Sequence, residues 1–238
     1  IKGDKSLRDG RGKKPIINRL LAISSPGESR TTFPDTPKQA RIYYRRIILS
    51  HNFNADRQSG MGDLLIRLAR STEAIKEKSR WDLFCETVSR IIPSTEIAIR
   101  LVPSNDSEAL AISRENKYVT LSEFQLGGEQ QCLERWARVD TQSDVCRLSG
   151  SGLLPLSSGQ LTFIRFAANA CLYIENGTMV LFDEPETHLH PNLISDFVQL
   201  LDGLLEDTGS FAILATHSAY FVREVPGSQV SILAQPHD

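Results

Sequence analysis

Two adjacent acidic residues, Asp183 and Glu184, follow an unbroken apolar run, TMVLF at 178–182. Such a run is typical of a strand buried on both faces of a parallel sheet, and open α/β sheets bind their ligands at the carboxyl ends of the strands. One carboxylate there could hold a hydrated Mg²⁺ beside a triphosphate while the next orients and deprotonates an attacking water. The pair therefore predicts nucleotide hydrolysis, with an ordinary solvated strand end as the alternative.

A serine-rich turn, LSSGQ at 156–160, precedes an apolar run with helical spacing. Free amide groups at a helix N-terminus form an anion site, which the helix dipole favours. The candidate nucleotide-binding residues of this turn are Ser157, Ser158, Gly159 and Gln160. The alternative is that the serines only cap the helix.

A histidine, His217, follows a second apolar run, FAILA at 211–215. If both runs are strands of one parallel sheet, their carboxyl ends meet at the same edge, which would put His217 beside Glu184. An imidazole in that place could sense the terminal phosphate of a nucleotide. A lone histidine at a strand end can also be purely structural.

The C-terminal part of the chain must supply the elements that position these residues. Strands at 178–182 and 211–215, joined by a helix with apolar residues from Leu193 to Leu205, predict a right-handed strand–helix–strand unit. The run NRLLAIS at 18–24 predicts another buried strand, and residues 230–233 have a strand-like pattern.

Residues between these parts have a different pattern. Apolar residues three and four apart over 61–92 predict one or two amphipathic helices. Alternation over 96–102 predicts a half-exposed strand, with which 118–124 could pair. We therefore expect an ATPase core lobe made of residues 1–51 and 149–238. Residues 52–148 would form an α+β insertion between these two pieces.

The composition excludes several classes of protein. The chain has 238 residues, of which 40% are hydrophobic and 24% charged, unlike disordered, collagenous or coiled-coil chains. No apolar run approaches the roughly 18 residues of a membrane span, and the charged opening segment is not a secretory signal. Because the four cysteines never form C-x-x-C, we expect reduced thiols in a cytoplasmic protein.

The net charge of −2 hides an asymmetry along the chain. Residues 1–50 hold 12 Lys and Arg against 4 Asp and Glu, which leaves 15 against 25 in the rest. A basic segment can contact the phosphates of a nucleotide or a nucleic acid, although a solvated surface is the commoner explanation. Nucleic acid stays open as a partner.

Taken in order, LSSGQ at 156–160, MVLFDEPETHLHP at 179–191 and ATHS at 215–218 resemble the signature, Walker B, D-loop and switch-histidine motifs of ABC-type ATPases. DEPETHLHP is similar to the SMC-like and overcoming-lysogenization-defect (OLD) branch rather than to the DEPTSALD of transporter subunits. RLLAISSPGES, followed by ARIYYRR, further resembles the PtuA ATPases of Septu and retron antiphage systems. The resemblance implies an α/β, ABC-type P-loop NTPase fold with a mainly parallel sheet and an inserted region.

The resemblance also implies ATP and Mg²⁺ as cofactors and gives each residue a role. Asp183 would bind Mg²⁺ through water, Glu184 would be the general base, and His217 would contact the γ-phosphate. Ser157 and Gly159 would clamp the γ-phosphate of a nucleotide held by another subunit, which implies a head-to-tail dimer or a higher oligomer.

Family D-loops communicate between the two shared sites, which would place Glu186, His188 and His190 at the dimer interface. Two histidines and a glutamate this close in sequence could be mistaken for a zinc site. Further ligands are not evident, so we do not expect a zinc site here.

One family motif has no counterpart in the sequence. The chain contains no G-x-x-x-x-G-K-[ST], and GRGKKP at 10–15 lacks both its glycine spacing and its Ser or Thr. Family members place this loop upstream of the strand at 18–24. We therefore expect that the chain is a fragment that lacks the Walker A segment.

The expected function is ATP hydrolysis in which nucleotide-dependent dimerisation controls a partner nuclease subunit in antiphage defence, with no role for a membrane. One alternative is an OLD-type enzyme that carries its own nuclease domain. Another is an ATP-dependent DNA clamp of the SMC or recombination-mediator kind, although residues 52–148 lack the heptads of an SMC. A transporter subunit fits least, because of the inserted region and the HLHP loop.

Overall fold

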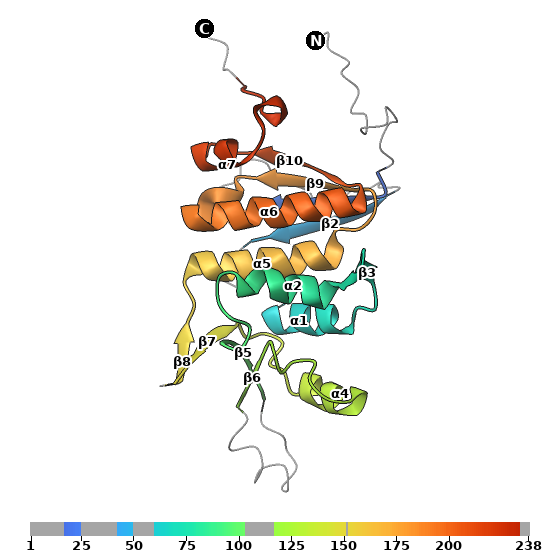
Figure 1. The fold of residues 1–238 in the computed structure, drawn as a ribbon, viewed down its shortest axis with the longest axis vertical. Helices are drawn as coiled ribbons and strands as arrows, with labels where there is room; N and C mark the ends of the chain where they lie inside the picture. Colours follow the sequence, from blue (N-terminus) through green and yellow to red (C-terminus); the bar gives the residue numbers. More distant parts are fainter. Residues whose placement is uncertain (1–16, 25–41, 50–59, 103–116, 151, 234–238) are drawn as a thin grey trace, which may run out of the picture.

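A computed structural model describes residues 17–24, 42–49, 60–102, 117–150 and 152–233 of the chain. Figure 1 shows a parallel sheet with long helices beside it towards one end of the molecule and a small antiparallel sheet towards the other. This mixed α/β arrangement is compatible with a P-loop NTPase fold.

The parallel sheet has four strands in the order β10-β9-β1-β2. Its members are β1 (Arg19–Ser24), β2 (Tyr43–Ile48), β9 (Thr178–Asp183) and β10 (Phe211–Ala215). Both neighbours of β9 are parallel to it, and Ser24 of β1 and Ala215 of β10 lie opposite Asp183 in the register. Three strands therefore end side by side at Asp183.

Two long helices pack beside the sheet and against each other, α5 (Ser158–Tyr173) and α6 (Pro191–Thr208). The α6 helix connects β9 to β10, as the sequence predicts, and ends at Gly209, whose φ of 59° closes it in a left-handed turn. Beyond β10 lie the short helices α7 (Ala219–Glu224) and η3 (Gly227–Gln229). The predicted strand at 230–233 is wrong, because these residues form no strand.

The expected helices of 61–92 are two, α1 (Met61–Arg70) and α2 (Arg80–Ser89). A two-residue hairpin, β3 (Ala74–Ile75) and β4 (Lys78–Ser79), separates them, and the Ser79 hydroxyl caps α2 by accepting from the amide of Asp82. Both helices pack on α5, which explains why α5 is buried almost all round: the sheet and α6 cover what α1 and α2 leave.

The antiparallel sheet has the order β6-β5-β7-β8. Its strands and the adjoining helix are β5 (Ile97–Arg100), β6 (Tyr118–Thr120), β7 (Cys146–Ser149), β8 (Gly152–Pro155) and α4 (Glu129–Ala137). The predicted pairing of β5 with β6 is confirmed. The β7–β8 hairpin was not predicted, and the expected boundary after residue 148 falls inside it. The division into domains itself stays a prediction.

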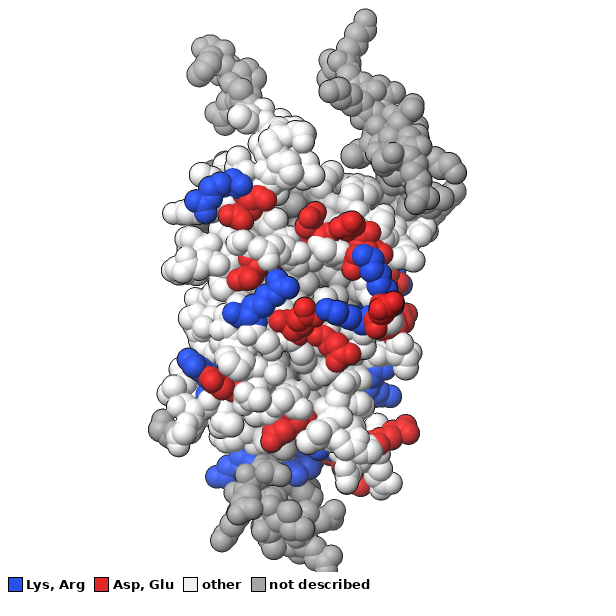
Figure 2. Space-filling model, viewed as in Figure 1, with Lys and Arg blue, Asp and Glu red and all other residues white. Residues whose placement is uncertain are grey.

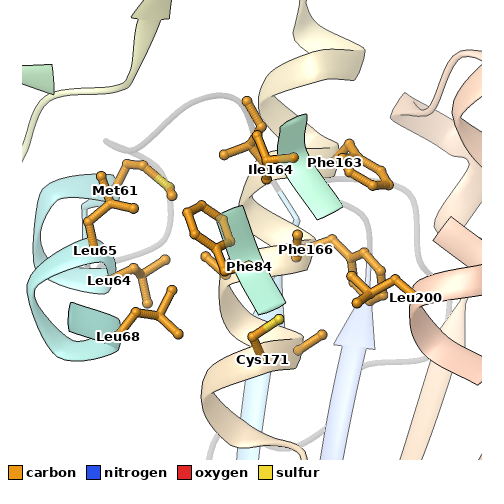
Figure 3. Packing of buried hydrophobic residues seen from close by; sticks show 14 of the residues in the cluster. Met61, Leu64, Leu65, Leu68, Phe84, Phe163, Ile164, Phe166, Cys171 and Leu200 are labelled. Atoms are coloured by element: carbon orange, nitrogen blue, oxygen red, sulfur yellow. The ribbon is translucent and has the colours of Figure 1, made fainter. Parts of the chain in front are cut away.

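One continuous hydrophobic core joins the helices to both sheets. Figure 3 shows apolar side chains of α1 and Phe84 of α2 pointing toward Ile164 and Phe166 of α5, with Leu200 of α6 beyond them. The fully buried Phe166 ring stacks on Phe197 of α6 at a centroid distance of 3.8 Å and meets Phe182 of β9 edge-on at 5.9 Å. Phe166 therefore links α5 to the strand that carries the acidic pair.

The cysteines are free thiols at Cys85, Cys132, Cys146 and Cys171. Burial raises the pKa of Cys85 and of Cys171 to about 12, so both thiols stay protonated at neutral pH. Low reactivity of this kind is typical of structural cysteines.

The apolar run at 211–215 predicts a strand buried on both faces, and the prediction of full burial is wrong. The run forms β10, but β10 is the edge strand of the described sheet, and 48% of Ile213 is exposed.

The strand β2 was not predicted from the sequence. Arg45 on β2 stacks its guanidinium over the ring of Tyr173 at 4.0 Å, which shows how a strand of aromatic and basic residues can still pack.

Surface charge in the view of Figure 2 is mixed, with acidic and basic side chains interspersed over its described part. The basic segment 1–16, which includes the residues at 10–15, lies outside the described residues, as does 25–41. Within the described part of the chain, no helix is long and apolar enough to cross a membrane.

We predict that Phe166→Ala lowers the free energy of unfolding by about 3–5 kcal/mol, because it leaves a cavity between α5, α6 and β9. Phe166→Leu should cost clearly less, since it keeps most of the apolar volume. Urea denaturation of both variants measures the difference. A loss below about 1 kcal/mol for the alanine variant would contradict this packing.

Candidate active site

Asp183 is the last residue of β9 and lies at the carboxyl edge of the parallel sheet. The ends of β1 and β10 flank it, through Ser24 and Ala215. The Asp183 side chain is half-buried at this edge. The three strand ends thus place one carboxylate where open α/β sheets bind ligands, as the sequence predicts.

Glu184 continues from Asp183 in an uncommon backbone conformation. Its φ of 48° and ψ of 56° are left-handed, which for a residue with a Cβ costs roughly 1–2 kcal/mol. The turn is held from both sides: the Glu184 amide donates to the Ala215 carbonyl at 2.9 Å, and the Glu184 carbonyl accepts from the Thr187 hydroxyl at 3.0 Å. A strained residue persists only where the surrounding structure holds it in place, and such residues cluster at functional sites.

His217 meets Glu184 across the strand ends. Its Nε2 lies 3.3 Å from Oε1 of Glu184, while 90% of the His217 side chain and 43% of the Glu184 side chain are exposed. Exposed pairs of this kind contribute little to stability, so the contact is not a device that holds the fold together. An exposed imidazole beside a carboxylate is available to a ligand at the sheet edge.

Glu186 lies in the single 3₁₀ turn η2 (Pro185–His188) that follows Glu184. Its Oε1 accepts a hydrogen bond from the Thr216 hydroxyl at 2.6 Å and another from the His217 amide at 2.9 Å. The segment after β9 and the loop after β10 are therefore tied together by one carboxylate.

Ser157 is the N-cap of α5, and the turn it begins has the form of a capping box. The Ser157 hydroxyl accepts from the amide of Gln160 at 3.2 Å, and the Gln160 side chain accepts from the amide of Ser157 at 3.0 Å. Ser157 and Ser158 are exposed, whereas Gly159 is buried. Figure 1 shows this end of α5 on the same side of the molecule as the carboxyl ends of β9 and β2.

The remaining residues of the expected D-loop have local partners. His190 caps α6, because its Nδ1 accepts from the amide of Asn192 at 3.4 Å and Pro191 takes the first helical position. His188 ends η2, and its side chain lies outside the described part of the structure. A place at a dimer interface stays a prediction for Glu186, His188 and His190.

The site residues fit Mg²⁺ better than an all-protein metal cage. Among the described residues, His, Cys, Asp and Glu form no group of three or more that could hold a metal ion. Mg²⁺ retains several waters and commonly takes one or two carboxylates together with substrate phosphates. Asp183 at the strand end, beside Glu184, can supply such a carboxylate.

A shallow cleft at the opposite end of the sheet is a less suitable site for an anion. It lies at the first residues of β1 and β2, Arg19 and Tyr43. Two of its basic groups already have acidic partners: Arg19 pairs with Glu175 at 2.5 Å, and Arg67 pairs with Asp63 at 2.9 Å. These two arginines are therefore less available to an anion than unpaired ones would be.

Sequence reasoning missed two features of the site. The contact of Thr216 with Glu186 spans 30 positions, and only the polar residue directly after an apolar strand hinted at it. The left-handed turn at Glu184 was also missed, since a residue before proline is normally extended.

Two comparisons with known proteins found sequences similar to this chain. A family model described as "AAA domain, putative AbiEii toxin, Type IV TA system" matches residues 150–223. The chain is 29% identical over 250 aligned positions to "Protein ea59" of Escherichia phage lambda, an alignment that covers 93% of the chain and 46% of that protein. The chain thus spans about half the length of the curated relative it matches.

The family match covers the serine turn, the acidic pair and His217. It supports an ATPase of the AAA or ABC-like class and, with it, a nucleotide as the ligand. The expected closeness to PtuA ATPases has no support in either match.

Proposed function

We propose that this chain belongs to an enzyme that binds and hydrolyses ATP at the carboxyl edge of the parallel sheet. The observation that carries the proposal is the 3.3 Å contact between His217 and Glu184, immediately beyond Asp183. A solvated strand end needs neither a strained glutamate nor a histidine placed against it. The AAA-domain match over the same residues adds independent support.

Glu184 is the general base in this proposal. Its carboxylate accepts a proton from a water molecule whose oxygen attacks the γ-phosphorus, while the bond from that phosphorus to the β–γ bridging oxygen breaks. The products are ADP and inorganic phosphate. His217 contributes a donor to the γ-phosphate oxygens, where negative charge must be stabilised as the bond breaks.

Asp183 would hold Mg²⁺ through water. When bound, the metal would supply positive charge that offsets the charge of the triphosphate. Asp183 is suited to this because it is the last residue of β9 and lies one residue before the proposed base.

The signature turn acts in trans in this proposal. Ser157 and Ser158 are exposed at the N-terminus of a 16-residue helix whose first turn carries no acidic residue, so an incoming phosphate meets no like charge there. A second subunit could present its own nucleotide to this turn. Head-to-tail association with two shared sites follows, and further association into a higher oligomer is compatible with it.

We further propose that nucleotide-dependent association controls a partner nuclease subunit in antiphage defence. Its support is the likeness of DEPETHLHP to the SMC-like and OLD branch, in which ATPases govern partners or attached domains. An OLD-type nuclease domain in the same protein, or a DNA clamp, would use the same site. Nuclease activity of the purified full-length protein without a partner would select the OLD alternative.

We predict that Glu184→Gln lowers the steady-state rate of ATP hydrolysis by about 10²- to 10⁴-fold, because it removes the proton acceptor but none of the phosphate contacts. Affinity for ATP, titrated with a labelled nucleotide, should stay close to that of the wild type. Glu129→Gln on the distant helix α4 is the matched control and should not change the rate. Hydrolysis by Glu184→Gln within twofold of the wild type would refute the assignment.

We also predict that Ser157→Arg abolishes hydrolysis while each subunit still binds ATP, because the added bulk blocks closure of the shared sites. Ser157→Ala is its control, since it removes the cap alone at a cost of about 0.5–2 kcal/mol of stability. The decisive measurement mixes Ser157→Arg with Glu184→Gln. A mixed dimer then has one site damaged twice and one site intact, so mixing should restore part of the activity. Normal hydrolysis by Ser157→Arg alone would exclude a composite site.

A further inference from the structure

One oxygen of Glu186 organises the backbone that carries His217. Oε1 of Glu186 accepts from the Thr216 hydroxyl at 2.6 Å and from the His217 amide at 2.9 Å. The Thr216 oxygen in turn accepts from the amide of Ser218 at 3.0 Å. Glu186, which follows β9, therefore holds the three residues after β10. It bonds Thr216 and His217 directly, and Ser218 is held through the Thr216 hydroxyl.

The imidazole of His217 cannot be oriented by packing, because 90% of the side chain is exposed. A side chain in solvent samples several rotamers unless its backbone and its neighbours restrict it. The neighbour here is Glu184, at 3.3 Å, and the backbone is held by Glu186. The place of Nε2 relative to the proposed base thus depends on Glu186.

The other oxygen of Glu186 indicates that this carboxylate is not there for stability alone. Oε2 is buried and has no hydrogen-bond partner within the described part of the chain. Leaving a buried carboxylate oxygen unpaired opposes folding, and native structures keep such groups rarely. The same carboxylate that leaves Oε2 unpaired makes two hydrogen bonds through Oε1 to the residues that carry the imidazole, Thr216 and His217.

We infer that Glu186 is a positioning residue that acts through His217, setting the imidazole against Glu184 and the γ-phosphate. The inference rests on the proposed ATPase function and adds to it a connection between the two strand ends within one subunit. Glu186 was expected only at a dimer interface, and the intrachain bonds give it a second task. It touches neither the reacting water nor the phosphate in this account.

The first test compares three variants of the full-length protein by steady-state ATPase kinetics. Glu186→Ala should lower kcat roughly 10- to 100-fold, the worth of hydrogen bonds to a charged acceptor. Glu186→Gln should recover most of that loss, because its carbonyl oxygen can accept the same two bonds. Thr216→Val removes one of the two donors and should lie between them, whereas the exposed Glu206→Ala on α6 serves as a control and should match the wild type.

The second test asks whether the effect passes through His217. In a His217→Ala background, Glu186→Ala should cause no further loss of kcat, because the group it positions is already gone. A merely structural role would give additive losses in the double variant. Additive losses, or a Glu186→Ala enzyme with wild-type kcat, would overturn the inference.

Hydrogen exchange separates this inference from the proposed function. The His217 amide should exchange roughly tenfold faster or more in Glu186→Ala than in the wild type, whether or not the protein hydrolyses ATP. Faster exchange in a protein without ATPase activity would defeat the proposed function while leaving Glu186 as the holder of this loop. Unchanged exchange would overturn the positioning role even in an active ATPase.

Discussion

The register of β9 against its two neighbours is the constraint on which the candidate site depends. Because Ser24, Asp183 and Ala215 are aligned in three parallel strands, whatever follows each strand emerges at one edge. Phe182, one residue before Asp183, is buried against the rings of Phe166 and Phe197. The aromatic core therefore holds the end of β9, and with it the backbone that carries Asp183.

Beyond that edge, three residues adopt arrangements that do not favour folding. Glu184 is left-handed without being glycine, Glu186 leaves one buried oxygen unpaired, and His217 extends into solvent. None of these features contributes appreciably to folding. Their concentration within the few residues after β9 and β10 is what distinguishes a functional site from an ordinary sheet edge, since departures from local rules gather where function requires them.

Much of this fold could be predicted from local patterns, because apolar runs and helical spacing are properties of short segments. The strands β1 and β9 and the helix α6 follow that rule. The exposure of β10 does not, since an edge position depends on the order of strands in the sheet and not on the strand's own sequence. In the same way, the proximity of His217 to Glu184 follows from parallel strand ends, whereas the bond from Thr216 to Glu186 joins side chains 30 positions apart that no periodicity relates.

The most direct test of the account is the structure of the full-length Glu184→Gln protein bound to ATP and Mg²⁺, determined by cryo-electron microscopy or crystallography. We predict that the γ-phosphate lies at the carboxyl ends of β1 and β9, within hydrogen-bonding distance of His217 Nε2, and that Asp183 binds the metal through water. Nucleotide phosphates bound elsewhere, such as the cleft at Arg19 and Tyr43, would contradict it.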